Sequence, residues 1–233
     1  VKNGINFMGQ KNYLGTFAVP WATLNDFLFL HSQPFSLKRA GLAEVVKVAV
    51  VKDAVFFDWL EEHAGALAAC RPDILEHAVE RSALLHAEHI ARGGDAFEMG
   101  SSRPLDFGHW AAHYMETMSG YTLGHAEAVS VAMCLDILYS VKKGWLPSRQ
   151  AERIIAVLKS LELPVFHPLL TRRTKDGACE ILKGLEAFRE HLGGHLTVLM
   201  LTGIGKGMDV HEIDAALMEE CIREMQVQAA SAE

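Results

Sequence analysis

The sequence predicts a mainly α-helical protein with a minor β contribution. Apolar residues recur every three or four positions from residue 35 nearly to the C-terminus, which is the period of a helix with one buried face. Glycine and proline residues divide this region into segments of ordinary helix length. By contrast, residues 1–30 combine closely spaced glycines with short β-prone runs. The chain therefore reads as a helical domain preceded by a small β segment.

The composition indicates a protein with a sizeable core and no polyanionic partner. At 233 residues and 50% hydrophobic content, the chain can bury one domain, or one domain with an appendage. The net charge of −7 and the scattered lysines and arginines argue against nucleic acid as the main partner. Apolar runs end well short of the ~18 residues that a membrane span needs. We therefore expect no nucleic-acid and no membrane partner.

Cysteine use points to a reducing compartment. The four cysteines lie far apart and form no CxxC pair. Cys134 falls in an apolar helical run, where a buried thiol is expected. Because reduced thiols are typical of cytoplasmic proteins, we expect a cytoplasmic location.

The N-terminal segment has the features of a sheet edge. Thr16–Pro20 and Trp21–Asn25 are two short β-prone runs. Two strands do not form a stable domain by themselves, so we expect them to belong to a sheet whose other strands lie outside this chain. The chain is accordingly divided into residues 1–30 and a helical domain of residues 31–233.

Three helices are predicted in the first half of this domain. The first begins near Phe35, with Ser36 as its candidate N-cap. The second spans Asp53 to Ala69, and the third spans Asp73 to Ala91. A glycine pair ends the third helix, and an irregular loop up to Pro104 follows.

The second half of the domain begins with two helices that carry histidines. They cover roughly Gly108–Met118 and Gly124–Lys143, with a turn between them. The remaining elements are a helix from Pro147 to Leu161, a helix from Gly177 to Leu192, a strand over Leu196–Leu201 and a final helix from about Asp214 to Gln228.

The histidines of these two helices predict a metal site. His109 and His113 are four residues apart and therefore share one helix face. His125 opens the next helix, and a short turn would bring it back beside the first pair. A catalytic zinc usually has three protein ligands and one open position, and two imidazoles with one carboxylate are an established set. His109 and His125 can supply the imidazoles, but the carboxylate must come from elsewhere.

Glu44 is the best candidate for the carboxylate. It interrupts the apolar face of a predicted helix, where a carboxylate is costly unless another group compensates it. The alternative is that Glu44 forms an ordinary surface pair with Lys47, three residues later.

His113 has three candidate roles. It can be a fourth ligand, an acid/base group beside the metal, or a core histidine that Glu116 or a backbone carbonyl satisfies. The glycine-rich segment Gly203–Gly207 lacks the spacing of a phosphate-binding loop and is a weak candidate for one.

Three linked motifs resemble the 3-dehydroquinate synthase family of sugar-phosphate cyclases. They are Gly41–Lys47 (Gly-Leu-Ala-Glu-Val-Val-Lys), Leu105–Glu116 with its two histidines, and Gly124–Val129 (Gly-His-Ala-Glu-Ala-Val). They occur in the family's order, and the histidines have its spacing. Further segments that resemble the family are Lys2, Gly9–Phe17, Ala22–Asp26 and Leu199–Gly205, so the similarity spans nearly the whole chain.

The resemblance implies a fold. Residues 1–30 would be the last strands of an N-terminal α/β nucleotide-binding domain, and residues 31–233 would be the helical C-terminal domain. The chain would then be a fragment or a truncated homologue, which alone we expect neither to bind NAD well nor to turn over. A homodimer is also expected.

The resemblance further implies a carbon–oxygen lyase that uses NAD and a metal, Zn²⁺ or Co²⁺. The substrate is a phosphorylated sugar. A ring hydroxyl is oxidised transiently, phosphate is eliminated, the ketone is reduced again and the ring closes by an aldol step. The metal is held by Glu44, His109 and His125, and it polarises the oxygen that is oxidised.

Other positions match the family's functional residues. Lys47 and His113 correspond to polar residues around the reacting centre, Lys11 and Asn12 to cofactor-side contacts, and Lys2 to a phosphate-side contact.

Several positions depart from the family and bear on the substrate. Dehydroquinate synthases hold a substrate carboxylate with a lysine and an arginine, and those positions are Glu88 and Ser102 here, with Arg103 displaced by one residue. Such a bidentate clamp cannot be rebuilt from these side chains. We therefore expect a phosphorylated sugar or polyol without a carboxylate. Two other departures are Asp106, where the family has asparagine, and Trp110, where it has threonine. A basic motif of the family near the end of the chain is also replaced, and Arg189 is the cation that remains there.

Two other functions fit the sequence. A metal-dependent polyol dehydrogenase shares the two-domain architecture and would release NADH instead of phosphate. A non-catalytic scaffold or binding protein would keep the helical fold without the substrate set.

Overall fold

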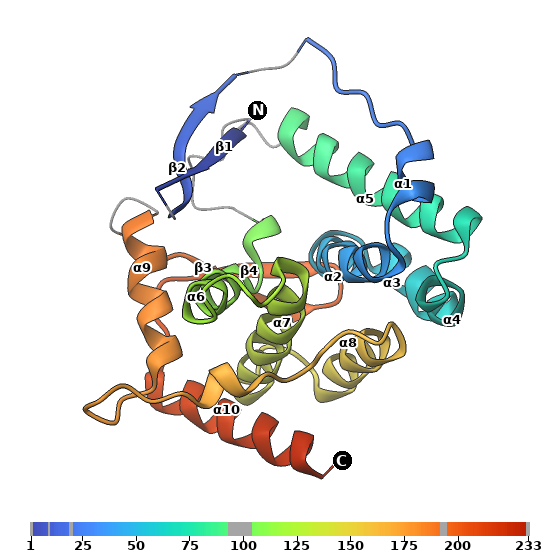
Figure 1. The fold of residues 1–233 in the computed structure, drawn as a ribbon. Helices are drawn as coiled ribbons and strands as arrows, with labels where there is room; N and C mark the ends of the chain where they lie inside the picture. Colours follow the sequence, from blue (N-terminus) through green and yellow to red (C-terminus); the bar gives the residue numbers. More distant parts are fainter. Residues whose placement is uncertain (1, 9, 19–20, 93–103, 192–194, 232–233) are drawn as a thin grey trace.

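The structure is a computed structural model that describes residues 2–8, 10–18, 21–92, 104–191 and 195–231. It is mainly helical with two short antiparallel hairpins, which confirms the predicted class (Figure 1).

Two helices form the centre of the domain. They are α2 (Phe35–Lys52) and α7 (His125–Lys142), and they pack against each other. Residues 128–137 of α7 and residues 45–51 of α2 are buried without interruption. A helix that is apolar on all sides needs partners on all sides, and α7 contacts α6, α8, α10 and β3 as well as α2. The core therefore surrounds these two helices.

The other helices cover this pair. Asp53 caps α3 because its carboxylate accepts a hydrogen bond from the Phe56 amide over 3.0 Å. Asp214 caps α10 in the same way. The covering helices are α3 (Ala54–Glu62), α4 (Ala64–Ala68), α5 (Pro72–Arg92), α6 (His109–Met118), α8 (Ser148–Ser160), α9 (Lys183–His191) and α10 (Ala215–Ala230), with short helical turns η1 (Pro104–Asp106), η2 (Pro168–Thr171) and η3 (Glu180–Leu182).

The N-terminal segment differs from its prediction. Strand β1 (Lys2–Phe7) pairs with β2 (Gln10–Phe17) across a turn at Met8, whose φ is +52°. The strand predicted over Thr16–Pro20 therefore ends at Phe17, and the strand predicted over Trp21–Asn25 is wrong. The hairpin satisfies the backbone of β2, while residues 21–25 have no strand partner and are exposed.

Three helix boundaries also differ. The helix predicted over Asp53–Ala69 is two helices, because the backbone leaves the helical region at His63. α2 begins after Pro34, and no side chain caps it, so Ser36 is not the N-cap. The helix predicted from Gly177 begins only at Lys183, because the preceding residues form a tight turn and η3. The short helix α1 (Leu28–Ser32) was not predicted.

The predicted late strand is one half of a hairpin. β3 (Val198–Gly203) pairs with β4 (Lys206–Val210), and Gly205 forms the turn with a φ of +77°. The Gly205 amide donates to the carbonyl of Val50 over 2.7 Å. The glycine-rich segment is therefore a hairpin turn packed on the end of α2.

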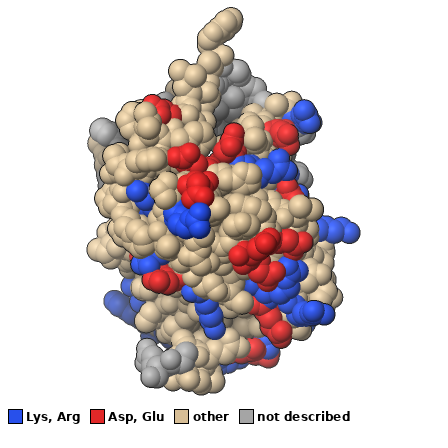
Figure 2. Space-filling view, turned by 90° about the vertical axis from the view of Figure 1, so that its right-hand side faces the viewer, with Lys and Arg blue, Asp and Glu red and all other residues tan. Residues whose placement is uncertain are grey.

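The surface carries mixed charge. On the face that Figure 2 shows, acidic and basic side chains are interspersed. Among the described residues, no helix is both long and apolar enough to cross a membrane.

Candidate metal centre

The first two histidines are positioned by the start of α6. Gly108 precedes the helix in the left-handed conformation, with a φ of +77°, which glycine adopts without strain. A side chain there would meet Met133 of α7 at 3.1 Å. The chain therefore turns tightly against α7 before His109 begins the helix.

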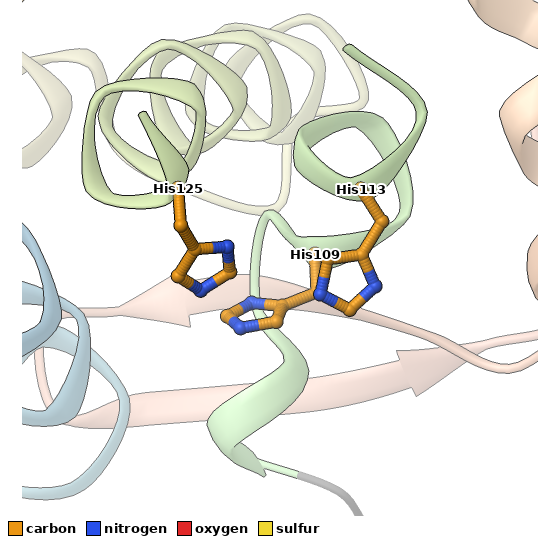
Figure 3. A group of neighbouring side chains, drawn as sticks. All are labelled: His109, His113 and His125. Atoms are coloured by element: carbon orange, nitrogen blue, oxygen red, sulfur yellow. The ribbon is translucent and has the colours of Figure 1, made fainter. Parts of the chain in front are cut away.

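The three histidines form one cluster. His109 and His113 lie on α6, and His125 is the first residue of α7. One ring nitrogen of each lies within 4.8 Å of the others. Figure 3 shows the rings of His109 and His113 extending from α6 and that of His125 from α7, gathered in one place. This confirms the predicted meeting of the three side chains.

Glu44 reaches the same cluster from α2. Its Oε1 lies 3.5 Å from Nε2 of His125 and 4.0 Å from Nε2 of His109. These separations are close to the ~3.4 Å between neighbouring ligand atoms on a tetrahedral zinc with bonds of about 2.0–2.2 Å. Oε1 is also buried and has no hydrogen-bond partner among the described residues. A divalent cation between the three side chains would satisfy it, so these residues fit the implied metal.

The other oxygen of Glu44 contacts Lys47. The Lys47 ammonium forms an ion pair with Oε2, and its side chain is 4% exposed. The predicted alternative of a surface pair is therefore half right. The pair forms, but the lysine is buried, and the carboxylate uses its second oxygen toward the histidines.

Hydrogen bonds set the tautomers of two histidines. Nδ1 of His109 donates to the carbonyl of Phe107 over 3.1 Å, and Nδ1 of His125 donates to Oε2 of Glu116 over 3.1 Å. These partners accept hydrogen bonds, so the proton lies on Nδ1 in each ring. The Nε2 lone pairs therefore face Glu44, ready to bind a metal.

The protonation states also suit a metal. Burial lowers the pKa of His109 to about 3, and the charge of Lys47 adds to this effect. Burial by itself would raise the pKa of Glu44, but the Lys47 ammonium that pairs with Oε2 opposes this rise, and the pKa of Glu44 lies well below its ordinary value. A neutral imidazole and an ionised carboxylate are the forms that coordinate a metal.

His113 lies at the edge of this arrangement. Its ring centroid is 5.1 Å from that of His109 and 5.6 Å from that of His125. The carboxylate of Glu116 hydrogen-bonds His125. The position of His113 is compatible with all three predicted roles, which are a fourth ligand, an acid/base group and a histidine satisfied by neighbouring groups, so its role stays a prediction.

The residues predicted for substrate binding are more scattered. Glu88 is exposed on α5, and Asp106 is half-buried in η1, three residues before His109. Arg189 is exposed on α9, where it pairs with Glu186. Arg103 lies outside the described residues.

The residues predicted for the nucleotide and phosphate lie in the N-terminal hairpin. Lys2 is in β1, and Lys11 and Asn12 are in β2. Only their backbone is described.

Sequence reasoning missed a buried carboxyl group beneath the site. Asp136 of α7 is completely buried, and its Oδ1 accepts a hydrogen bond from the indole of Trp110 over 2.9 Å. Burial raises its pKa to about 7, although the hydrogen bonds from Trp110 and the Gly108 backbone oppose the rise. The sequence feature that could have predicted it is a single acidic residue within the long apolar run of α7, where a carboxyl group is costly to bury.

Comparison with known proteins gives a consistent result. A family model described as 3-dehydroquinate synthase C-terminal matches residues 41–183. The 3-dehydroquinate synthase of Halorhodospira halophila is 36% identical over 205 residues, and that of Pseudomonas aeruginosa (strain UCBPP-PA14) is 32% identical over 223 residues. The alignments cover 88% and 95% of this chain but 56% and 59% of those proteins. The chain thus spans less than two thirds of their length.

Solved structures show the same fold. ValA, a 2-epi-5-epi-valiolone synthase from Streptomyces hygroscopicus subsp. jinggangensis with NAD⁺ and Zn²⁺ bound, superposes with a TM-score of 0.86 at 30% identity. The match covers 97% of this chain and 61% of that one. A 2-deoxy-scyllo-inosose synthase complexed with carbaglucose-6-phosphate, NAD⁺ and Co²⁺ has a TM-score of 0.73 at 20% identity, with 96% and 62% covered, which supports the fold alone.

Proposed function

Since this chain belongs to the 3-dehydroquinate synthase family through its C-terminal domain, we propose that it forms the metal- and substrate-binding part of a sugar-phosphate cyclase. The reaction is an NAD- and metal-dependent elimination of phosphate, followed by ring closure of a phosphorylated sugar. The observation that carries this proposal is the unpartnered Oε1 of Glu44, which faces Nε2 of both His109 and His125.

Five residues of this chain have proposed roles around the reacting centre. Glu44, His109 and His125 would hold Zn²⁺ or Co²⁺, which polarises a substrate oxygen when bound. Lys47 forms an ion pair with Oε2 of Glu44, which neutralises the charge of that carboxylate. His113, beside them, exchanges a proton with the substrate as the reaction proceeds.

NAD would be the second cofactor, as it is in the valiolone synthase structure. Lys11 and Asn12 are its proposed contacts, and Lys2 is the proposed contact of the substrate phosphate.

The proposed substrate is a phosphorylated sugar or polyol without a carboxylate. The support is chemical, because acids stand where dehydroquinate synthases have a lysine and an asparagine. Glu88 occupies the expected lysine position, and Asp106 occupies an expected asparagine position. Arg189 has Glu186 as an ion-pair partner. These acids favour hydroxyl groups of the substrate, which can donate hydrogen bonds to them.

Metal analysis is the first test. The purified chain, incubated with Zn²⁺ or Co²⁺ and then desalted, should retain about one equivalent. Glu44→Gln and His125→Ala should lose the metal, and their far-ultraviolet circular dichroism should keep the helical signal. His31→Ala, which removes an exposed histidine elsewhere on the surface, is the matched control. Wild-type protein without stoichiometric metal would contradict the proposal.

Turnover is the second test, and it uses the complete gene product. Phosphorylated hexoses and heptuloses, with and without a carboxylate, are incubated with NAD and the metal. Phosphate should be released at a constant NAD concentration, and the substrates without a carboxylate should react faster. Accumulation of NADH without phosphate release would instead identify a polyol dehydrogenase.

A further inference from the structure

We propose that Glu116 is a positioning residue of the candidate metal centre, which holds the ring of His125 with Nε2 directed at Glu44. The inference rests on the proposed metal site and assigns a role to a side chain outside the ligand set.

The burial of Glu116 is the first observation. Its side chain is 7% exposed, and a buried carboxylate is costly unless it is hydrogen-bonded. Oε2 accepts a hydrogen bond from Nδ1 of His125 over 3.1 Å. The sequence thus retains a buried carboxylate that accepts a hydrogen bond from a candidate metal ligand.

The location of His125 explains why it needs such a partner. It is the first residue of α7, and its side chain is 37% exposed. The other imidazole ligand, His109, is 12% exposed, and the backbone carbonyl of Phe107 holds its Nδ1. A ring near the surface can rotate about its side-chain bonds. The carboxylate restricts this rotation, selects the Nδ1–H tautomer and raises the basicity of Nε2.

The backbone of Glu116 has a separate structural role. Its carbonyl accepts hydrogen bonds from the Tyr121 amide and the Ser119 hydroxyl, each over 2.8 Å, which close the turn between α6 and α7. Substitution of the side chain leaves these bonds in place. The positioning role can therefore be tested without removing the turn.

The experiment titrates the metal-free chain with Co²⁺ and follows the visible d–d absorption of the bound ion. Glu116→Ala and the isosteric Glu116→Gln should weaken Co²⁺ binding by about 10- to 100-fold. The loss should be smaller in Glu116→Gln, because the amide carbonyl of glutamine can still accept a hydrogen bond from Nδ1 of His125. Glu76→Gln is the matched control, because Glu76 pairs with His31 on the surface in the same way. Its Co²⁺ affinity should equal that of the wild type.

Nitrogen-15 NMR of the metal-free proteins provides a second readout. The His125 ring should be in the Nδ1–H tautomer in the wild type and should shift toward Nε2–H in Glu116→Ala. A purely structural role would not change this tautomer.

Two outcomes overturn the proposal. If both Glu116 variants are folded and bind Co²⁺ within about two-fold of the wild type, Glu116 does not position the ligand. If Glu116→Ala does not fold, Glu116→Gln alone decides. A wild-type chain that binds no Co²⁺ would overturn the proposed function itself, which distinguishes the two failures.

Discussion

The indole N–H of Trp110 donates a hydrogen bond to Oδ1 of Asp136 across 2.9 Å, and both side chains are buried. This bond ties the first turn of α6, one residue after His109, to the middle of α7. The second oxygen, Oδ2, is buried and has no hydrogen-bond partner among the described residues. The hydrogen bond therefore joins α6 to α7, but the ionised form of the buried Asp136 carboxyl group is unfavourable.

Asp136 should make stability fall as the pH rises. Its pKa is about 7 in the folded chain and about 3.9 in an unfolded one. Between these values the folded state binds the extra proton, so each pH unit costs up to about 1.4 kcal/mol of unfolding free energy. Urea unfolding measures the free energy of unfolding of Asp136→Asn and of the wild type at each pH. As the pH rises from about 4 to 7, the wild type should lose stability relative to the variant.

The matched control for this prediction is Asp73→Asn. Arg71 lowers the pKa of the exposed Asp73 carboxyl, so the stability difference of Asp73→Asn should stay nearly constant from pH 4 to pH 7 and should change, in the opposite sense, only below about pH 4. A pH-independent difference between Asp136→Asn and the wild type would contradict the prediction.

Removing the indole donor should destabilise the fold. Trp110→Phe leaves Oδ1 of Asp136 without its side-chain partner, and an unsatisfied buried polar group costs about 1–3 kcal/mol. Chemical denaturation measures this loss. In the double variant Trp110→Phe, Asp136→Asn, the loss should be smaller than the sum of the two single effects. Strict additivity would show that the two side chains do not interact.

Lys47→Met should destabilise the metal-free protein more than the metal-loaded one. Lys47 is the buried cation that pairs with Glu44, and its loss leaves the carboxylate without a neutralising partner at a cost of about 1–3 kcal/mol. A divalent ion bound to Glu44 would replace that charge. Thermal melting with and without Zn²⁺ tests this. Lys142→Met, which removes a more exposed pairing with Glu220 and Glu224, should cost about 0–1 kcal/mol in both states.

Gly108→Ala should weaken both the fold and metal binding. Its left-handed backbone costs about 1–2 kcal/mol with any side chain, and the added methyl group would meet Met133 at 3.1 Å. The strain would displace His109, the next residue. Gly144 is the control, because its φ is +72° and its surroundings are open. Gly144→Ala should lose stability from backbone strain alone and keep its metal. Equal metal affinity in both variants would rule out a role for the Gly108 turn in placing His109.

Much of the fold followed from local patterns. The boundaries of α6, α7, α8 and α10 match the predictions within a few residues, because helix periodicity, glycine stops and an aspartate cap are local features. The grouping of His109, His113 and His125 was likewise predicted, since a helix face and a short turn bring them together. The N-terminal strands were harder, because their pairing depends on a hairpin turn at Met8 rather than on the β-prone run around Trp21.

The sequence by itself determined the helical class, the histidine cluster and the identity of Glu44 as the candidate third ligand. Only the tertiary structure decided how these groups are supported. Lys47 is buried against Glu44, Glu116 accepts a hydrogen bond from His125, and Asp136 accepts one from Trp110, the residue after His109. The physical reason is that burial and hydrogen bonding in these contacts depend on how α2, α6 and α7 pack together, and periodicity within one helix does not encode that packing.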